Sequence, residues 1–142
     1  MKVHQIMTNR PITIGPDEPV TAAAALLRRC NLGAVPVCDA SGRLRGMVTD
    51  RDIVVRCLAL DYDPSSTRVS EIMSRGVTTV PPDMPVAAAA ERMARQQIRR
   101  LPVTDGGRLV GMLTLGDLAR REELRTECAL ALGSISSNVN LR

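Results

Sequence analysis

The sequence predicts an α+β fold in which two β-α-β-β-α repeats pack around a local twofold axis and a short C-terminal helix follows. Two observations lead to this prediction. The stretch "GMVTDRDI" at residues 46–53 returns as "GMLTLGDL" at residues 111–118, and "VHQIMTNRPITI" from Val3 aligns without a gap with "VSEIMSRGVTTV" from Val69. A unit of about 55 residues buries little surface when it is alone. The two copies are therefore expected to pack face to face.

Each copy begins with a short extended run, "PITI" or "GVTTV", which ends where glycine or proline stops it. A helix is predicted next, with Asp17 and Asp83 placed to cap it. Its apolar positions recur at helical spacing and predict one buried face. These positions are Val20, Ala23, Ala24 and Leu27 in the first copy, and Val86, Ala89, Ala90 and Met93 in the second.

A β-hairpin and a second helix complete each copy. The runs "AVPVCD" and "LRGMVT" in the first copy, and "LPVTD" and "LVGMLT" in the second, are joined by glycine-containing turns typical of hairpins. The second helix is expected from Asp52 or Asp117. These elements predict repeats at 1–56 and 69–121 with a linker at 57–68. Residues 122–142 are expected to form one more helix and a frayed tail, "SSNVNLR".

Composition narrows the classes of function. Among 142 residues, 44% are hydrophobic and 1% are aromatic, and the net charge is +4. Sites for single-stranded nucleic acid usually combine basic grooves with stacked aromatic rings, so a nucleic-acid role is disfavoured while acidic small molecules stay possible. No apolar run approaches the roughly 18 residues of a membrane span, and no export signal is evident, so a cytoplasmic location without membrane association is expected.

Neither catalysis nor metal binding is predicted. His4 is the only histidine, and no nucleophile, base and orienting group can be assembled around it, so the protein is not expected to be an enzyme and needs no catalytic cofactor. The four cysteines lack the paired spacing of a zinc site and are expected to be reduced thiols. They are Cys30, Cys38, Cys57 and Cys128.

The motifs, in their order, resemble those of the tandem CBS-domain pair, or Bateman module. The matching pieces are "DEPV" before the first helix, "GAVPV" and "RRLPV" on the second strands, and the two "GM" stretches quoted above. The resemblance covers residues 3–121 and is greatest to small stand-alone bacterial pairs without a catalytic domain. It implies binding of an adenosine nucleotide (AMP, ADP, ATP or S-adenosylmethionine) in clefts between the repeats. It also implies homodimers that stack two pairs into a flat disc.

Two Thr-x-x-Asp corners are the strongest site candidates. Thr49 and Asp52, and likewise Thr114 and Asp117, place a hydroxyl and a carboxylate where a helix begins. The carboxylate is suited to the hydroxyls of a ribose, and the threonine with the first helical amides is suited to a phosphate. The same spacing is also that of a capping box, in which both side chains only satisfy the helix end. Gly46 and Gly111 add to the ligand interpretation because they let a group approach the backbone closely.

The two corners are predicted to be unequal. Arg99 and Arg100 precede "LPV" in the second copy, where modules that resemble this one often place a basic residue on the phosphates. Gly33 and Ala34 stand there in the first copy, although Arg51 lies inside the first corner. Each arginine is a candidate phosphate contact, and a solvated side chain is the alternative.

Four apolar residues are candidates to hold the adenine, with core packing as the alternative for each. They are Ile14, Val35, Val80 and Leu101. The sequence thus favours a regulatory module that binds an adenosine nucleotide and acts on another protein. The sequence does not identify that protein. A ligand-free dimeric scaffold for interaction or stress response is the second hypothesis, and a redox- or metal-responsive protein that uses its thiols is a third.

Overall fold

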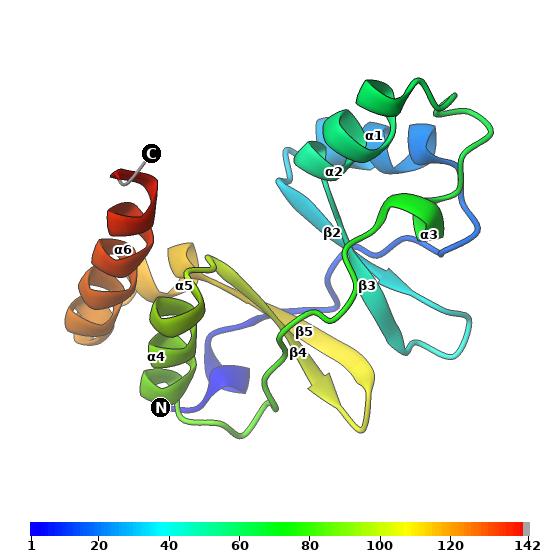
Figure 1. Ribbon diagram of the computed structural model, residues 1–142. Coiled ribbons are helices and arrows are strands. Elements are labelled where there is room, and N and C mark those ends of the chain that lie inside the picture. Colours follow the sequence, from blue (N-terminus) through cyan, green and yellow to red (C-terminus); the bar gives the residue numbers. More distant parts are fainter. Residues whose placement is uncertain (141–142) are drawn as a thin grey trace. The chain divides into compact units, whose positions relative to one another are not determined.

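The computed structural model describes residues 1–140, with side chains described through Ser136. Helices and short antiparallel sheets alternate along the chain, which confirms the α+β class and the C-terminal helix (Figure 1). Within these residues, no helix combines the length and apolarity that a membrane span requires.

The chain forms two compact units that do not follow the sequence repeats strictly. Unit 1 contains Met1–Pro11, Thr78–Gly106 and the chain from Val110 onward. Unit 2 contains Ile12–Val77 and the short segment Gly107–Leu109, which includes the start of β5. Each unit therefore contains the main part of one repeat together with the opening segment of the other.

Unit 2 is built around one β-hairpin covered by helices. Its elements are α1 (Val20–Arg29), β2 (Ala34–Cys38), β3 (Leu44–Thr49), α2 (Asp50–Arg56), the 3-10 helix η2 (Leu58–Leu60) and α3 (Val69–Ile72). The hairpin is antiparallel and pairs Ala34 with Thr49 and Val37 with Gly46. The predicted hairpin of the first copy is thus confirmed.

Unit 1 repeats this arrangement and adds the C-terminal helix. Its elements are η1 (Val3–Gln5), β1 (Thr8–Asn9), α4 (Val86–Gln96), β4 (Arg100–Asp105), most of β5 (Arg108–Thr114), α5 (Leu115–Ala119), η3 (Glu122–Leu124) and α6 (Arg125–Asn140). The sheet order is β1-β5-β4. Helix α6 packs along α4 and extends to Asn140, so it includes most of the segment predicted to fray (Figure 1). Residues 141–142 lie outside the described residues.

The opening segments of the two repeats are exchanged between the units. In unit 1, β1 from the start of the chain pairs antiparallel with β5, with Thr8 opposite Met112. In unit 2, Ser74 forms the matching bridge to Met47 on β3, with hydrogen bonds of 3.0 and 2.8 Å between the two backbones. Each hairpin is therefore completed by a segment that lies before or after the rest of its unit in sequence.

The repeated glycines make room for these exchanged segments. A Cβ atom added to Gly46 would lie 2.6 Å from the carbonyl oxygen of Ser74 and 2.9 Å from the sulfur of Met73. At Gly111 it would lie 2.9 Å from the carbonyl oxygen of Thr8 and would also overlap the Met7 sulfur. The close approach expected at these glycines is thus made by the chain itself rather than by a ligand.

The first helix of each copy does not begin as predicted. Its N-cap residue is Pro19 in α1 and Pro85 in α4, and neither helix receives a side-chain cap, so Asp17 and Asp83 do not cap them. The physical reason is that backbone carbonyls already satisfy the first amides. Val20 N–H donates to Thr67 O, and Val86 N–H donates to Met1 O, both at 2.9 Å.

The extended runs before these helices form single bridges rather than strands. Ile14 pairs with Val37, and Val80 pairs with Val103, both in parallel orientation. The prolines that follow each run have no N–H to donate, so they end the pairing after one residue.

Each unit has its own aliphatic core, and α6 makes the two cores differ. Val20, Ala23 and Leu27 are buried in unit 2 as their spacing predicts, whereas Ala24 is exposed. The equivalent alanine in unit 1, Ala90, is only 3% exposed because α6 packs against α4. The sequence pattern alone does not distinguish these two alanines, since the covering helix comes from outside the repeat.

Candidate functional site

Both Thr-x-x-Asp corners are complete capping boxes. In unit 2, Thr49 is the N-cap of α2; its Oγ1 accepts from Asp52 N–H, and the Asp52 carboxylate accepts from Thr49 N–H, both at 3.0 Å. In unit 1, Thr114 caps α5 in the same way. Its Oγ1 accepts from Asp117 N–H at 3.2 Å, and the Asp117 carboxylate accepts from Thr114 N–H at 2.8 Å. The capping interpretation is therefore confirmed at both corners.

The remaining oxygen of each carboxylate also has a partner. Ser74 Oγ donates to Asp52 Oδ1 at 3.2 Å, and Arg56 Nε lies 3.7 Å from the same oxygen. Asp117 Oδ1 pairs with the guanidinium of Arg120, whose side chain is 71% exposed. Both carboxylates are buried, so a ribose would reach Asp117 only by displacing the exposed arginine.

Replacing these aspartates by alanine tests the capping boxes. We expect Asp117→Ala to lower the free energy of unfolding by about 1 kcal/mol, because Thr114 N–H loses its acceptor and the capping box of α5 loses one of its two hydrogen bonds. Asp52→Ala should have a larger effect, since Ser74 and Arg56 also lose their acceptor. Urea denaturation measures the free energy of unfolding of each alanine variant, with the asparagine variant at the same position for comparison. Alanine variants as stable as the wild type would show that the carboxylates do not stabilise the helix ends.

A pocket in unit 1 brings several of the predicted phosphate residues together. Its volume is about 420 Å³, within the roughly 300–1,000 Å³ typical of small-molecule sites. Arg99, Arg100, Thr114, Leu115, Gly116, Ala119, Cys128 and Leu132 line it. Three of these, Arg99, Arg100 and Thr114, were predicted from the sequence. Asp117 is not among the lining residues, and its carboxylate pairs with Arg120.

The junction between β4 and α5 positions the two arginines. Leu115 N–H donates to Arg99 O at 2.8 Å, which fixes the start of β4 beside the first turn of α5. Arg99 is exposed and Arg100 is half-buried. Neither forms an ion pair within the part of the chain whose side chains are described. The pocket is therefore positively charged on this side.

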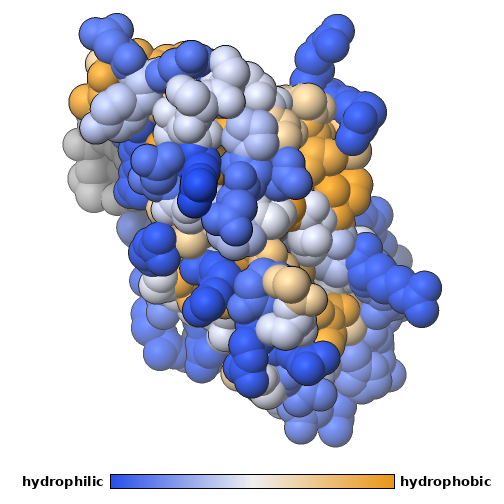
Figure 2. All heavy atoms as spheres, turned by 90° about the vertical axis from the view of Figure 1, so that its right-hand side faces the viewer, coloured by the Kyte–Doolittle hydropathy of each residue, from blue (hydrophilic) through white to orange (hydrophobic). Residues whose placement is uncertain are grey.

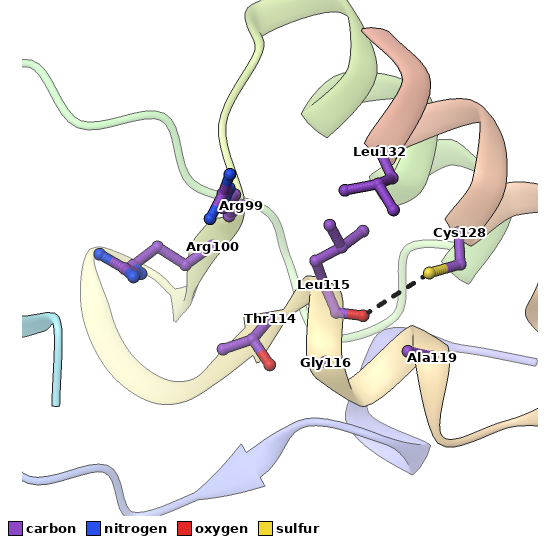
Figure 3. A pocket seen from close by; sticks show the side chains of 8 residues that line it. All are labelled: Arg99, Arg100, Thr114, Leu115, Gly116, Ala119, Cys128 and Leu132. Atoms are coloured by element: carbon purple, nitrogen blue, oxygen red, sulfur yellow. Dashed lines mark hydrogen bonds between the residues drawn. The ribbon is translucent and has the colours of Figure 1, made fainter. Parts of the chain in front are cut away.

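The opposite side of the pocket is apolar. Figure 3 shows the Leu115 side chain directed towards Leu132 of α6, with Arg99 and Arg100 on the other side of Leu115. Cys128 Sγ lies 4.0 Å from the carbonyl oxygen of Leu115. Sequence reasoning missed this wall. The sequence predicted a C-terminal helix here. Because α6 has no counterpart in the first copy, the alignment of the two copies did not indicate where this helix would pack.

The four residues predicted to hold an adenine lie in the two cores. Val35 and Leu101 have no exposed surface, Val80 is 1% exposed and Ile14 is 6% exposed. None of them lines the pocket in unit 1. Core packing, the other interpretation, describes all four in this structure, and a contact with a base stays a prediction.

Unit 2 lacks the positive charge of the unit 1 pocket at the equivalent positions. Gly33 and Ala34 stand where unit 1 has Arg99 and Arg100. Arg51 is exposed, and its N–H donates to the carboxylate of Asp50 at 2.9 Å. The two corners therefore differ: Arg99 and Arg100 line the pocket in unit 1, whereas glycine and alanine stand at the equivalent positions in unit 2.

The cysteines show no metal or disulfide arrangement. All four are free thiols, and no group of three metal-ligating side chains occurs among the residues that the structure describes. Burial, with the nearby Asp39 carboxylate, raises the pKa of Cys38. A smaller thiolate fraction at neutral pH makes Cys38 less reactive, so the thiol-based hypothesis gains nothing from this residue.

Comparison with known proteins extends these observations. The chain is 41% identical over 134 residues to the CBS domain-containing protein YhcV of Bacillus subtilis, a match that covers 94% of both chains. It is also similar to the crystal structure of Hypoxic Response Protein I with two coordinated zinc ions. That similarity has 36% identity and a TM-score of 0.78, and covers 85% of this chain and 98% of the other.

Two further similar structures contain adenosine compounds. The CBS domain pair of protein MJ0100, in complex with 5′-methylthioadenosine and S-adenosyl-L-methionine, is 33% identical with a TM-score of 0.73. The match covers 84% of this chain and 94% of that one. CBSX2 in complex with AMP is 27% identical with a TM-score of 0.76, and the match covers 89% and 98% of the two chains.

The CBS domain model matches twice, at residues 3–58 and 69–123. Each match overlaps one of the two sequence copies, and together they span most of the chain. The chain therefore belongs to the CBS domain family and contains two CBS domains in tandem.

Proposed function

We propose that the protein is a regulatory module that binds an adenosine nucleotide in the unit 1 pocket. The main support for the proposal is that Arg99, Arg100 and Thr114 line one pocket whose other side is apolar. Guanidinium groups form charge-assisted hydrogen bonds to phosphate oxygens, and the Thr114 hydroxyl adds a further polar contact. AMP and S-adenosyl-L-methionine bind to similar CBS pairs, which supports an adenosine ligand.

The ribose is assigned to Asp117 under this proposal. Asp117 directly follows Gly116, which lines the pocket. The second oxygen of its carboxylate pairs with the exposed Arg120. Ligand binding would release Arg120 to solvent or to the phosphate. The equivalent corner of unit 2, with Thr49, Arg51 and Asp52, is a weaker candidate because Ser74 from the exchanged segment already contacts its carboxylate. Binding in clefts between the repeats stays a prediction.

A regulatory role requires that the ligand favour one conformation over another. The protein then transmits occupancy to a partner whose identity the sequence does not give, and it performs no catalysis itself. This agrees with its similarity over nearly its whole length to a stand-alone CBS domain protein. The cytoplasmic location expected from the sequence stays a prediction.

A thermal-shift experiment with AMP, ADP, ATP and S-adenosylmethionine tests the proposal. A ligand at 100 times its dissociation constant adds about 2.7 kcal/mol of stability, which corresponds to a rise in Tm of roughly 10 °C for a domain of this size. We expect at least one of the four to produce such a rise, while adenosine without phosphate produces less. Unchanged Tm values with all four compounds would contradict the proposal.

The capping boxes favour a second candidate, a scaffold without a ligand. Both carboxylates satisfy helix ends and have further partners, so neither requires a nucleotide to explain it. Under this alternative, Asp117→Ala lowers stability without changing any binding. Under the proposed function, the same variant also weakens nucleotide binding, which distinguishes the two.

We further propose that the protein forms a homodimer through an exposed apolar surface on unit 2. This α2–η2 patch consists of Val54, Val55, Leu58, Leu60 and Tyr62, each between 45% and 56% exposed. The face in Figure 2 shows hydrophobic areas within an otherwise mostly hydrophilic surface. Exposed apolar side chains gathered on one short segment often mark a contact between proteins.

Light scattering after size-exclusion chromatography tests the homodimer. We expect the wild type to have the mass of a dimer and Leu58→Asp to have the mass of a monomer. Leu130→Asp is the matched control, because Leu130 is also exposed but lies on α6. A Leu58→Asp protein with the same mass as the wild type would show that the α2–η2 patch is not the interface.

A further inference from the structure

We infer that helix α6 supplies the wall that contacts the base in the unit 1 pocket, and that Leu132 is therefore a residue that determines ligand specificity. The inference rests on the proposed function and extends it to a residue outside both CBS domain matches, which end at residue 123. Leu132 lines the pocket together with Leu115 and is 46% exposed, so its side chain is available to a ligand.

The core packing of unit 1 explains why the wall is not formed by the residues predicted from the sequence. Val80 and Leu101, the residues predicted to hold a base there, have almost no exposed surface and contribute to the hydrophobic core. They cannot contact a ligand unless the core opens. The apolar surface within the pocket is instead provided by α5, through Leu115 and Ala119, and by Leu132 of α6.

Helix α6 is anchored well enough to present Leu132 in a defined position. Ala131 has no exposed surface and Ile135 is 5% exposed, so the residues that flank Leu132 on the packed side of α6 are buried. Ser134 Oγ donates to Ala94 O of α4 at 2.7 Å, which ties the same turn to the neighbouring helix. A side chain held on a rigid element loses little conformational freedom when a ligand binds.

The pocket thus separates two kinds of chemistry. Arg99 and Arg100 lie on one side of Leu115, and Leu132 lies on the other (Figure 3). No carboxylate is among the residues that line the pocket. An anion alone would use only the arginine side, whereas a ligand with a phosphate and a flat apolar ring would use both. The arrangement therefore favours a nucleoside phosphate over an inorganic phosphate.

Isothermal titration of wild type and Leu132→Ala with AMP, and separately with inorganic pyrophosphate, tests the inference. We expect Leu132→Ala to weaken AMP binding by roughly tenfold, because apolar contact with the base is lost. Pyrophosphate binding should not change, since it uses the arginines alone. Leu130→Ala is the control, because Leu130 lies on α6 outside this pocket and should leave both affinities unchanged.

Hydrogen exchange of the α6 amides gives a second readout that does not depend on a variant. AMP should slow exchange in residues 125–136, and pyrophosphate should not. The inference is overturned if Leu132→Ala binds AMP as tightly as the wild type, or if AMP and pyrophosphate lose affinity equally. If the wild type binds neither compound, the proposed function itself fails, and the role of α6 falls with it.

Discussion

Replacing Gly111 by alanine is expected to destabilise the protein by about 1–3 kcal/mol, as overpacking of a tightly packed site usually does. The added Cβ would lie 2.9 Å from the carbonyl oxygen of Thr8, a backbone atom of the exchanged β1 segment that cannot rotate away. Gly46→Ala should have a similar effect, because its Cβ would lie 2.6 Å from Ser74 O. Thermal and urea denaturation measure both.

Gly133→Ala provides the matched control for this prediction. Gly133 lies within α6, and a Cβ added there meets no heavy atom within 4 Å. Alanine favours a helix over glycine by roughly 0.8–1 kcal/mol, so this variant should be more stable than the wild type. If Gly111→Ala were as stable as Gly133→Ala, the segment exchange would not be packed as the structure describes.

The double variant Arg99→Ala/Arg100→Ala is expected to weaken nucleotide binding by at least about 100-fold. Each charge-assisted hydrogen bond to a phosphate contributes roughly 1.5–3 kcal/mol, and about 1.4 kcal/mol corresponds to a factor of ten in affinity. Because neither arginine forms an ion pair among the described side chains, their removal should change stability little. Isothermal titration with AMP measures the loss.

The control is a second arginine doublet, changed in the variant Arg28→Ala/Arg29→Ala. It removes the same charge from the last turn of α1, in unit 2, and should leave the affinity for AMP nearly unchanged. Equal losses in the two double variants would mean that the net charge of the protein, rather than the pocket, attracts the nucleotide.

Much of the local structure follows from sequence because it depends on neighbouring residues. The hairpins form where alternating apolar runs flank a glycine turn, and the capping boxes form where threonine precedes aspartate by three residues. Where a distant segment intervenes, the same reasoning fails. Asp17 and Asp83 do not cap their helices, because Thr67 O and Met1 O already accept from the first amides.

The segment exchange could not be predicted from the sequence for a related reason. The openings of the two repeats, "VHQIM" and "VSEIM", are so alike that the sequence does not indicate which hairpin each one joins. The apolar wall of the pocket was missed because α6 has no counterpart in the first repeat. In contrast, the sequence did single out Arg99, Arg100 and Thr114, which line one pocket, and their contact with a ligand stays a prediction.

A crystal structure of the protein grown with AMP tests the central claim most directly. The account predicts one nucleotide in unit 1, with its phosphate between Arg99, Arg100 and Thr114 and its adenine against Leu132. Arg120 should then have moved away from the Asp117 carboxylate, which would accept from the ribose hydroxyls. A saturating concentration of AMP that leaves this pocket empty, or a nucleotide bound to other residues, would contradict it.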